Sequence, residues 1–216
     1  MIVSMWMTRE VATIEPAVPI NEALALMVKR HVRRLPVVEA HDGGARLVGM
    51  VTATDIRRAY PSDVNPFSIV APDAEGIATT TAEIMSRRLW TTAPDAPIEK
   101  AAAEMRERRI GALPVVRNGA LVGLITESDI FRAFVAILHS PDAGARVTFD
   151  ASRHEDVFGL IAEYARRHRV RVLSLVSAEQ HDHPVCVVRL AGAGIDKMLD
   201  DLWASGHAVL NVLRLP

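Results

Sequence analysis

The fold is decided by a stretch of sequence that occurs twice. It reads MTREVATIEPAVPINEALALMVKRHVRRLPVV from Met7 and MSRRLWTTAPDAPIEKAAAEMRERRIGALPVV from Met85, so the two copies align at an offset of 78 residues. After a turn that is four residues longer in the first copy, LVGMVTATDI from Leu47 matches LVGLITESDI from Leu121 at an offset of 74. An internal repeat of this kind indicates that each copy is one supersecondary unit and that the copies pack on each other.

Each copy is predicted to fold as a β-α-β-β-α unit preceded by a short helix. A strand is expected near each Thr-x-x-Pro, and the next helix opens at Pro19 or Pro97, because proline is tolerated in the first helical turn. The pattern Ile20, Leu24 and Met27 has helical spacing, whereas LPVV and LVGMV are β-branched runs beside glycine-bearing turns. A single copy buries a modest core, so the two copies are expected to pack together.

The remainder of the chain is predicted to contain a linker and a third unit. We expect the first repeat over residues 1–60, a proline-rich linker over 61–80, the second repeat over 81–138 and a further domain over 145–216. The third unit reads as β-α-β-β-α-β, which is typical of a ferredoxin-like sandwich of one antiparallel sheet and two helices. The predicted fold class is therefore α/β, of the α+β type.

The composition excludes several classes of protein. Half of the 216 residues are apolar, and 25 basic residues nearly balance 26 acidic ones, which gives no general attraction to nucleic acid or to anionic lipid. The N-terminus lacks the features of a signal peptide, and the apolar runs are too short to span a membrane. Cys186 is the only cysteine, so no intramolecular disulfide can form. We expect a cytoplasmic protein without a nucleic-acid or membrane partner.

The strongest local signal is the twin motif that ends the repeats, Gly49 to Asp55 and Gly123 to Asp129. In each, a strand runs directly into a helix whose first turn carries hydroxyl groups and a carboxylate. Amide groups at a helix N-terminus favour phosphate, and an acidic side chain there can accept hydrogen bonds from a ribose diol. The alternative is helix capping, for which Thr, Ser and Asp are preferred. The repetition favours a nucleotide site.

These two motifs and the two LPVV strands resemble the CBS-domain family, whose tandem repeats form a Bateman module. The resemblance covers about residues 2–136 and implies two clefts for adenosyl ligands: AMP, ADP, ATP, S-adenosylmethionine or NAD. It implies that Asp55 and Asp129 hold ribose hydroxyls. The other residues that it implies near ribose, phosphate or base are Thr13, Pro36, Thr52, Thr54, Thr91, Pro114, Thr126 and Ser128.

Phosphate recognition also needs positive charge. Arg33 and Arg34 stand where similar proteins often carry a phosphate-facing cation, but the second repeat has Gly111 and Ala112 at the matching positions. We therefore expect unequal clefts, with solvated arginines as the alternative. Arg57, Arg58 and Arg132, on the closing helices, are expected to lie outside the clefts.

The third unit resembles an ACT-type regulatory domain, and the whole arrangement resembles the acetoin-utilisation accessory protein family. ACT domains that bind amino acids carry a Pro-Gly turn where this chain has His154-Glu155-Asp156, whose carboxylates would repel an amino acid's own. A dimerising or relaying role is therefore favoured over an amino-acid pocket, and the carboxylates are explained by the helix dipole.

Other candidate residues favour structural roles. His181-Asp182-His183 is predicted to be a hairpin turn rather than a metal site, Gly192 to Gly194 a turn, and Cys186 an inert core thiol. The three tryptophans, Trp6, Trp90 and Trp203, are expected in a core or an interface.

The leading hypothesis is a non-catalytic regulator. It would sense an adenine nucleotide, act as a homodimer, and control an unidentified enzyme or transporter. One rival is the same fold with empty clefts, serving association alone. The other is a nucleotide-acting enzyme, for which the sequence offers no nucleophile-elbow or phosphate-loop motif.

Overall fold

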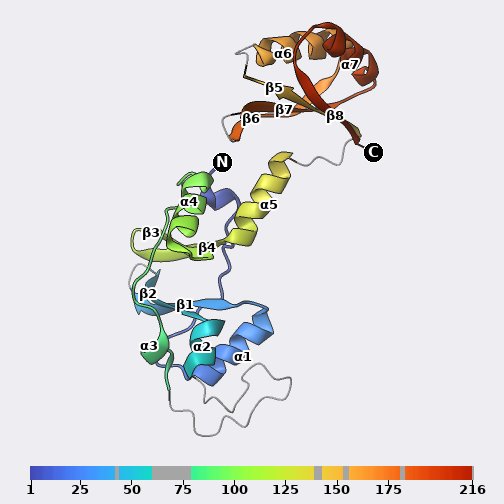
Figure 1. Ribbon diagram of the computed structural model, residues 1–216. Coiled ribbons are helices and arrows are strands. Elements are labelled where there is room, and N and C mark those ends of the chain that lie inside the picture. Colours follow the sequence, from blue (N-terminus) through green and yellow to red (C-terminus); the bar gives the residue numbers. More distant parts are fainter. Residues whose placement is uncertain (42–43, 60–78, 139–142, 153–155, 181–182, 216) are drawn as a thin grey trace. The chain divides into compact units, whose positions relative to one another are not determined.

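The structure is a computed structural model that describes residues 1–41, 44–59, 79–138, 143–152, 156–180 and 183–215 (Figure 1). Its contacts divide the chain into two compact units, Met1–Arg132 and Ala133–Pro216, so the division falls within the helix that ends the second repeat. The predicted linker over 61–80 lies outside the described residues except for its last two positions.

The first unit contains both repeats, and the two repeats have the same order of elements. The first repeat has η1 (Val3–Met5), α1 (Ile20–Arg30), β1 (Arg34–His41), β2 (Gly44–Thr52) and α2 (Ala53–Ala59). The second has α3 (Thr81–Ile84), α4 (Ile98–Arg108), β3 (Ala112–Arg117), β4 (Ala120–Thr126) and α5 (Glu127–Leu138), which extends into the second unit. The predicted short leading helix, the central helix, the hairpin and the closing helix are thus confirmed in both copies.

The duplication extends to the register of the strands. The strands form one antiparallel sheet in the order β1-β2-β4-β3, in which β2 and β4 meet at Arg46 and Ala120. Leu35 pairs with Val51 in the first hairpin, and Leu113 pairs with Ile125 in the second. Each hairpin also has one register irregularity at the same place in its LPVV run.

One sequence prediction is wrong in detail. The segments near Thr13 and Thr91 form no strand; each contributes one parallel bridge, Ile14 to Val37 and Thr92 to Val115. The reason is the proline two residues further on in each copy, because proline has no amide hydrogen with which to extend a ladder.

The leading segments of the two repeats are exchanged. The segment at Thr8, before the first repeat's central helix, pairs with Leu124 of β4, while Ser86, before that of the second repeat, pairs with Met50 of β2. The two glycines of the twin motif make this crossing possible. A Cβ at Gly49 would collide with the Met85 side chain, and a Cβ at Gly123 would collide with that of Met7. The leading segment of each repeat therefore packs against a strand of the other repeat.

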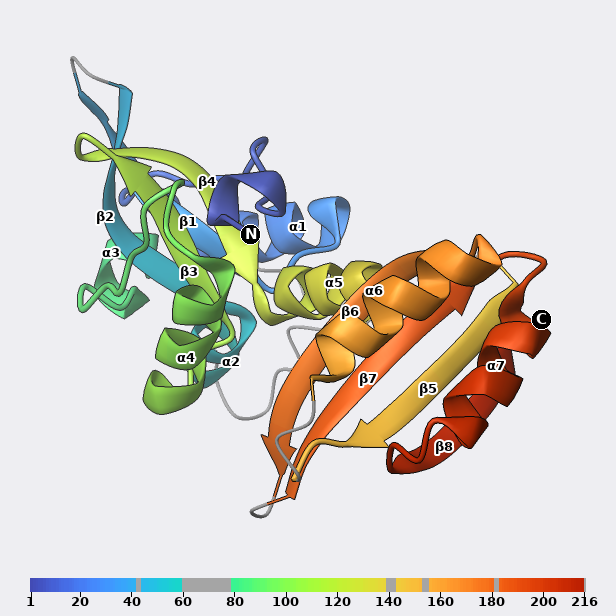
Figure 2. The same ribbon diagram turned by 90° about the horizontal axis from the view of Figure 1, so that it is seen from above.

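The second unit is one antiparallel sheet with two helices. Its elements are β5 (Gly144–Asp150), α6 (Val157–His168), β6 (Arg171–Gln180), β7 (His183–Ala191), α7 (Ile195–Ala204) and β8 (Val209–Leu215). The strand order is β6-β7-β5-β8, and both helices lie on one face of the sheet (Figure 2). This is the predicted β-α-β-β-α-β order. Phe149, Ile161 and Met198 lie in the core between sheet and helices.

The structure of the second unit tests the sequence predictions for Asp156 and Cys186. Asp156 caps α6 by accepting a 2.8 Å hydrogen bond from the amide of Gly159, whereas His154 and Glu155 fall outside the described residues. Cys186 is buried in the sheet, and this burial raises the pKa of its thiol. The expected turn at His181 and Asp182 also lies outside the described residues. Over the described parts of the chain, every helix is too short or too polar to cross a membrane.

Candidate functional site

Two cavities lie where the exchanged segments meet the sheet of the first unit. Cleft A, of about 280 Å³, is lined by Arg34, Met50, Thr52 and Asp55 of the first repeat and by residues 86, 88–90, 109–112 and 114 of the second. Cleft B, of about 470 Å³, is lined by residues 8, 10–12, 30, 32 and 34 of the first repeat and by Leu124 and Thr126 of the second. Each cleft is therefore built by both repeats.

In cleft A, the motif aspartate both caps a helix and faces the cavity. Oδ2 of Asp55 accepts hydrogen bonds from the amide of Thr52 at 2.8 Å and from its hydroxyl at 2.6 Å. No other residue in the described parts of the chain forms a hydrogen bond or ion pair with Oδ1 of Asp55. Capping therefore accounts for one carboxylate oxygen and leaves the other available to a ligand.

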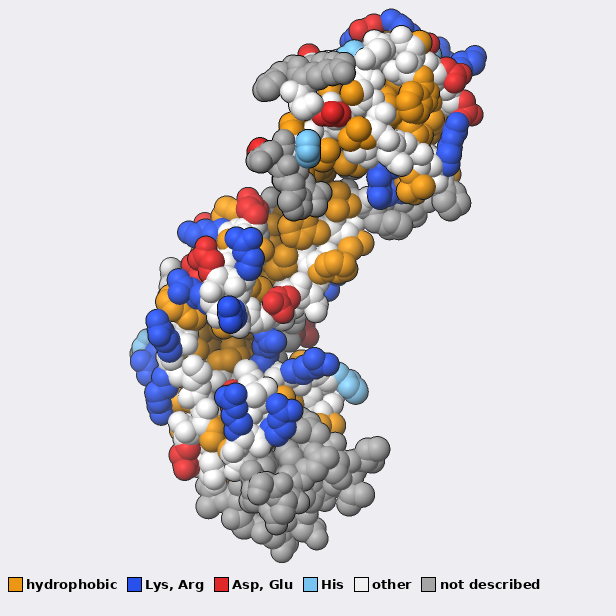
Figure 3. Space-filling model, viewed as in Figure 1, with side chains coloured by type: hydrophobic (Ala, Val, Ile, Leu, Met, Phe, Trp, Pro, Cys, Tyr) orange, Lys and Arg blue, Asp and Glu red, His pale blue; other side chains and the backbone are white. Residues whose placement is uncertain are grey.

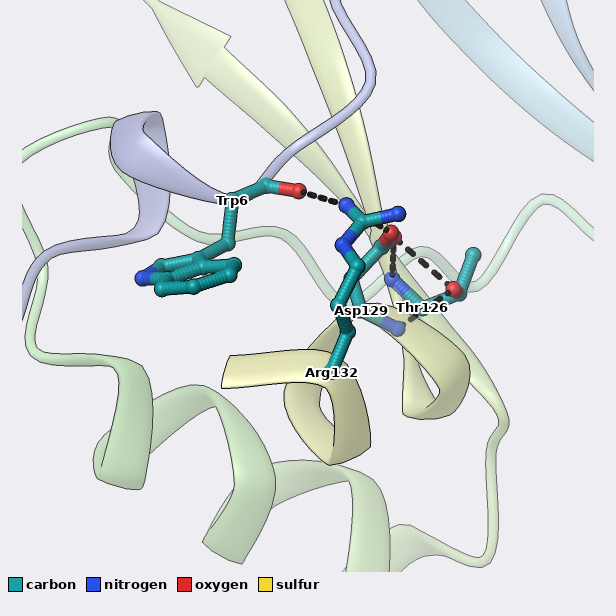
Figure 4. A network of polar contacts seen from close by, with 4 residues as sticks. All are labelled: Trp6, Thr126, Asp129 and Arg132. Carbon is teal, nitrogen blue, oxygen red and sulfur yellow. Dashed lines mark hydrogen bonds and ion pairs between the residues drawn. The ribbon is translucent and has the colours of Figure 1, made fainter. Parts of the chain in front are cut away.

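The matching aspartate of the second repeat, Asp129, has hydrogen-bond partners on both carboxylate oxygens. Oδ2 of Asp129 accepts bonds from the amide and the hydroxyl of Thr126 at 2.9 and 2.8 Å, as in the first repeat. Oδ1, however, accepts a 2.8 Å bond from Nη2 of Arg132, which also donates to the carbonyl oxygen of Trp6 at 3.0 Å (Figure 4). Asp129 is 5% exposed and does not line cleft B.

Cleft A is rich in positive charge. Arg34, Arg88 and Arg109 line it, against the single carboxylate of Asp55. Figure 3 shows a hollow with a hydrophobic floor in the first unit, bordered by Lys and Arg side chains. Arg109 is the residue that ends α4 in the left-handed conformation, with φ 54°. A cavity of this composition suits an anionic ligand that also carries hydroxyl groups.

Arg34 reaches from the first repeat to the second, and a glycine makes room for it. A Cβ at Gly111 would lie 2.9 Å from Nη2 of Arg34 and equally close to Oε2 of Glu127. Burial lowers the pKa of the Arg34 guanidinium, and the charge of Glu127 opposes this shift. Arg34 lines cleft B as well. The second repeat lacks a cation at position 111, but its place is taken by an arginine of the first repeat.

The tryptophan of cleft A is held by cations. The guanidinium carbon of Arg108 lies 3.2 Å from the ring centroid of Trp90, and that of Arg88 lies 5.4 Å away. Trp90 was expected in a core or an interface; the exchanged segment places it in the cleft wall instead. Trp203 is 58% exposed, and Trp6 is half-buried.

Cleft B differs from cleft A at symmetry-related positions. The offset of 78 places Glu10 opposite Arg88 and Ala12 opposite Trp90. Cleft B therefore has a carboxylate where cleft A has a guanidinium, and a methyl group where cleft A has an indole. Its positive charge comes from Arg30 and Arg34.

The structure brings together part of the predicted residue set. Thr52, Asp55 and Pro114 line cleft A, and Thr126 lines cleft B. The predicted residues that line neither cleft are Thr13, Arg33, Pro36, Thr54, Thr91, Ser128 and Asp129. Of these, Arg33, Thr54, Thr91 and Ser128 are exposed.

The sequence did not predict Arg88, Trp90 and Arg109 in cleft A, or the ion pair of Arg132 with Asp129. The first two enter the cleft through the exchange of leading segments, which pairs Ser86 with Met50 and is visible only in the tertiary structure. Nothing in the sequence distinguishes Arg132 from its counterpart Arg58.

Comparison with known proteins identifies both repeats. A family model described as the CBS domain matches residues 3–62 and 82–136. A homoserine O-acetyltransferase of Methanohalobium evestigatum is 34% identical over 131 residues, which are 60% of this chain. That match covers 23% of the acetyltransferase, so the chain spans about a quarter of the length of this curated relative.

Three solved structures are similar to part of the chain. A putative acetoin utilization protein from Vibrio cholerae is 30% identical, with a TM-score of 0.53 over 64% of this chain and 93% of that one. CBSX2 in complex with AMP is 26% identical, with a TM-score of 0.52 over 64% and 98%. The CBS domain pair of protein MJ0100, in complex with 5′-methylthioadenosine and S-adenosyl-L-methionine, is 28% identical, with a TM-score of 0.51 over 63% and 97%. Since the family model matches both repeats, and these matches cover more than half of the residues of this chain, the chain belongs to the CBS-domain family.

Proposed function

We propose that this CBS pair binds an adenine nucleotide in cleft A and serves a regulatory, non-catalytic role. The observation that carries the proposal is the available Oδ1 of Asp55, in a cavity that three arginines also line. A carboxylate can accept the hydrogen bonds of a ribose diol, and guanidinium groups match phosphate oxygens bidentately. The AMP bound by CBSX2 and the adenosyl ligands bound by protein MJ0100 support an adenosine-containing ligand.

The charge in cleft A favours a phosphate-bearing ligand over S-adenosylmethionine. Arg34, Arg88 and Arg109 outnumber the one acid, Asp55, so the lining residues carry a net positive charge. A sulfonium group would add another positive charge, whereas a phosphate would neutralise part of the excess. Met50, Leu89 and Ile110 supply apolar surface for the base in the same cavity. We therefore expect AMP, ADP, ATP or NAD to bind more tightly than S-adenosylmethionine.

Calorimetric titration of the intact chain with AMP, ATP, NAD and S-adenosylmethionine tests this proposal. We expect Asp55→Ala to weaken AMP binding by about 1–3 kcal/mol, or about 5- to 150-fold, because a charged hydrogen-bond acceptor is removed from cleft A. Asp129→Ala is the matched control: it removes the same helix cap but no lining residue of cleft A, so AMP affinity should stay within about twofold of wild type.

The same titration distinguishes the alternatives. Heat from none of the four ligands would favour a purely structural module with empty clefts. Consumption of a saturating nucleotide in the presence of magnesium would favour an enzyme. Tighter binding of S-adenosylmethionine than of AMP would contradict the charge argument.

For the rest of the chain, we propose an ACT-like domain in residues 145–216 that dimerises the protein or relays the ligand signal, in the cytoplasm, to an enzyme or transporter. The β-α-β-β-α-β order and the helix-covered sheet support this assignment. On the sheet, a cavity of about 230 Å³ is lined by Arg146, Ser174, Val176 and neighbouring residues. A relay requires that the ligand bind one arrangement of the molecule better than another.

A further inference from the structure

On the basis of the proposed function, we infer that Arg132 determines how many nucleotides this CBS pair binds. Its guanidinium donates a hydrogen bond to Oδ1 of Asp129, the carboxylate oxygen with which a ribose near cleft B would have to form its own hydrogen bond. The pair then binds one nucleotide, in cleft A, although both repeats carry the complete Gly-to-Asp motif.

Both oxygens of the Asp129 carboxylate have hydrogen-bond partners. Oδ2 accepts two hydrogen bonds from Thr126, and Oδ1 accepts the bond from Arg132. The side chain of Asp129 is 7% exposed, whereas that of Arg132 is 61% exposed, so the acid is buried while its arginine partner reaches solvent. A ribose hydroxyl that bound Oδ1 would therefore compete with a charged donor for the little of this oxygen that is accessible.

The arginine is itself held in place by the leading segment of the first repeat. Nη2 of Arg132 donates to the carbonyl oxygen of Trp6 as well as to Asp129. Trp6 follows η1, and its amide donates to the carbonyl of Val3 at 3.0 Å. Val3 is fully buried, and its amide donates to the carbonyl of Ala96 at 2.9 Å. The acceptor that fixes Arg132 is thus part of the packed structure.

The first repeat provides an internal comparison. The offset of 74 makes Arg58 the counterpart of Arg132, and the offset of 78 makes Ile84 the counterpart of Trp6. Within the described residues, Arg58 forms neither an ion pair with Asp55 nor a hydrogen bond with Ile84. The arginine at this helix position therefore pairs with the motif aspartate in the second repeat and does not do so in the first.

The test is the stoichiometry of AMP binding to the full chain, measured by titration calorimetry. We expect about one site per wild-type chain, with any second site at least about tenfold weaker, or about 1.4 kcal/mol. Arg132→Ala should add a second site per chain. Arg58→Ala, the matched control, should leave one site. Asp129→Ala in the Arg132→Ala background should remove the added site and keep the site in cleft A.

The outcomes separate this inference from the proposed function. Two comparable sites in the wild-type chain, or a single site in Arg132→Ala, would overturn the inference while leaving nucleotide binding intact. A third outcome is that Arg132→Ala binds AMP, the wild-type chain does not, and Asp129→Ala in the Arg132→Ala background abolishes this binding. That outcome would support the blocking role of Arg132 and contradict the proposal for cleft A. No binding by either chain would overturn both. Arg132→Met, which keeps the length and apolar stem of the side chain without a donor, repeats the experiment should the alanine variant not fold.

Discussion

Asp55 and Asp129 occupy the same position in the twin motif but have different hydrogen-bond partners. Both accept two hydrogen bonds from the preceding threonine, so the capping function is common to the repeats. They differ in the second carboxylate oxygen, which is available in cleft A and bound by Arg132 in the other repeat. The capping and ligand-binding interpretations of the motif are therefore compatible at Asp55.

Substitution of Arg34 tests whether this side chain recognises phosphate in cleft A. Arg34→Ala should weaken AMP binding by about 1.5–3 kcal/mol, or about 10- to 150-fold, because one charged donor to phosphate is lost. Adenosine, which has no phosphate, should bind wild type and variant with affinities within about threefold of each other. Titration of both ligands into both proteins measures the difference.

Arg33→Ala is the matched control for this test, since Arg33 is the neighbouring arginine, is exposed and lines neither cleft. An equal loss of AMP affinity in both variants would instead favour a general effect of positive charge. A loss in Arg33→Ala alone would restore the sequence-based prediction that Arg33 faces the phosphate.

At the scale of elements, the exchanged leading segments explain why each cleft contains residues from both repeats. Ser86 pairs with Met50 of β2 in the first repeat, and the residues that follow it bring Arg88 and Trp90 into the cleft that Asp55 also lines. The crossing depends on close contact between Gly49 and Met85, which follows α3. The glycine of the twin motif is thus required by packing rather than by the ligand.

Substitution of this glycine should disturb both stability and binding. Gly49→Ala should lower the free energy of unfolding by about 1–3 kcal/mol, because the added methyl group overpacks the contact with Met85. AMP affinity should fall as well, since the displaced segment carries cleft-lining residues. Urea denaturation and titration of the same preparations measure the two effects.

A double-mutant cycle supplies the control for Gly49→Ala. Met85→Ala removes the side chain that the new methyl group meets, but it also destabilises the chain because Met85 is buried in the core, so the double variant should lose less stability than the sum of the two single losses. Strictly additive losses would show that the methyl group acts elsewhere.

At the scale of the whole molecule, the two compact units have separate cores. The clefts belong to Met1–Arg132, and the four-stranded sheet with α6 and α7 belongs to Ala133–Pro216. Helix α5 is continuous across the division, and its first turn contains Asp129, the last residue of the twin motif. A helix shared in this way provides a covalent route by which ligand binding in one unit can affect the other.

Scanning calorimetry tests whether the signal is relayed between the units. AMP at about 100 times its Kd should stabilise the first unit by about 2.7 kcal/mol, which raises its unfolding temperature. If the second unit relays the signal, its transition should also rise with AMP, by a smaller amount, and Asp55→Ala should abolish both shifts. A second transition that stays fixed while the first one moves would contradict the relay.

The duplicated architecture can be predicted from the order of the amino acids alone. The offsets of 78 and 74 residues, the prolines before the central helices and the alternation of helical and strand patterns are local features, and they predict all the helices and hairpins of both repeats. They also identify Thr52 and Asp55, because a strand that runs into a helix places its capping residues at a predictable position. The exception is the Thr-x-x-Pro segment, where proline limits pairing to one bridge.

Which residues share a cleft, and which of the two aspartates pairs with an arginine, depends on contacts between distant parts of the chain. The exchange of segments brings Arg88 and Trp90 into the same cleft as Asp55, the end of α4 adds Arg109, and the segment at the start of the chain places the carbonyl of Trp6 within reach of Arg132. These contacts join residues far apart in the chain, so no local pattern encodes them. Arg58 and Arg132 look alike in sequence, and they differ because their neighbours in space differ.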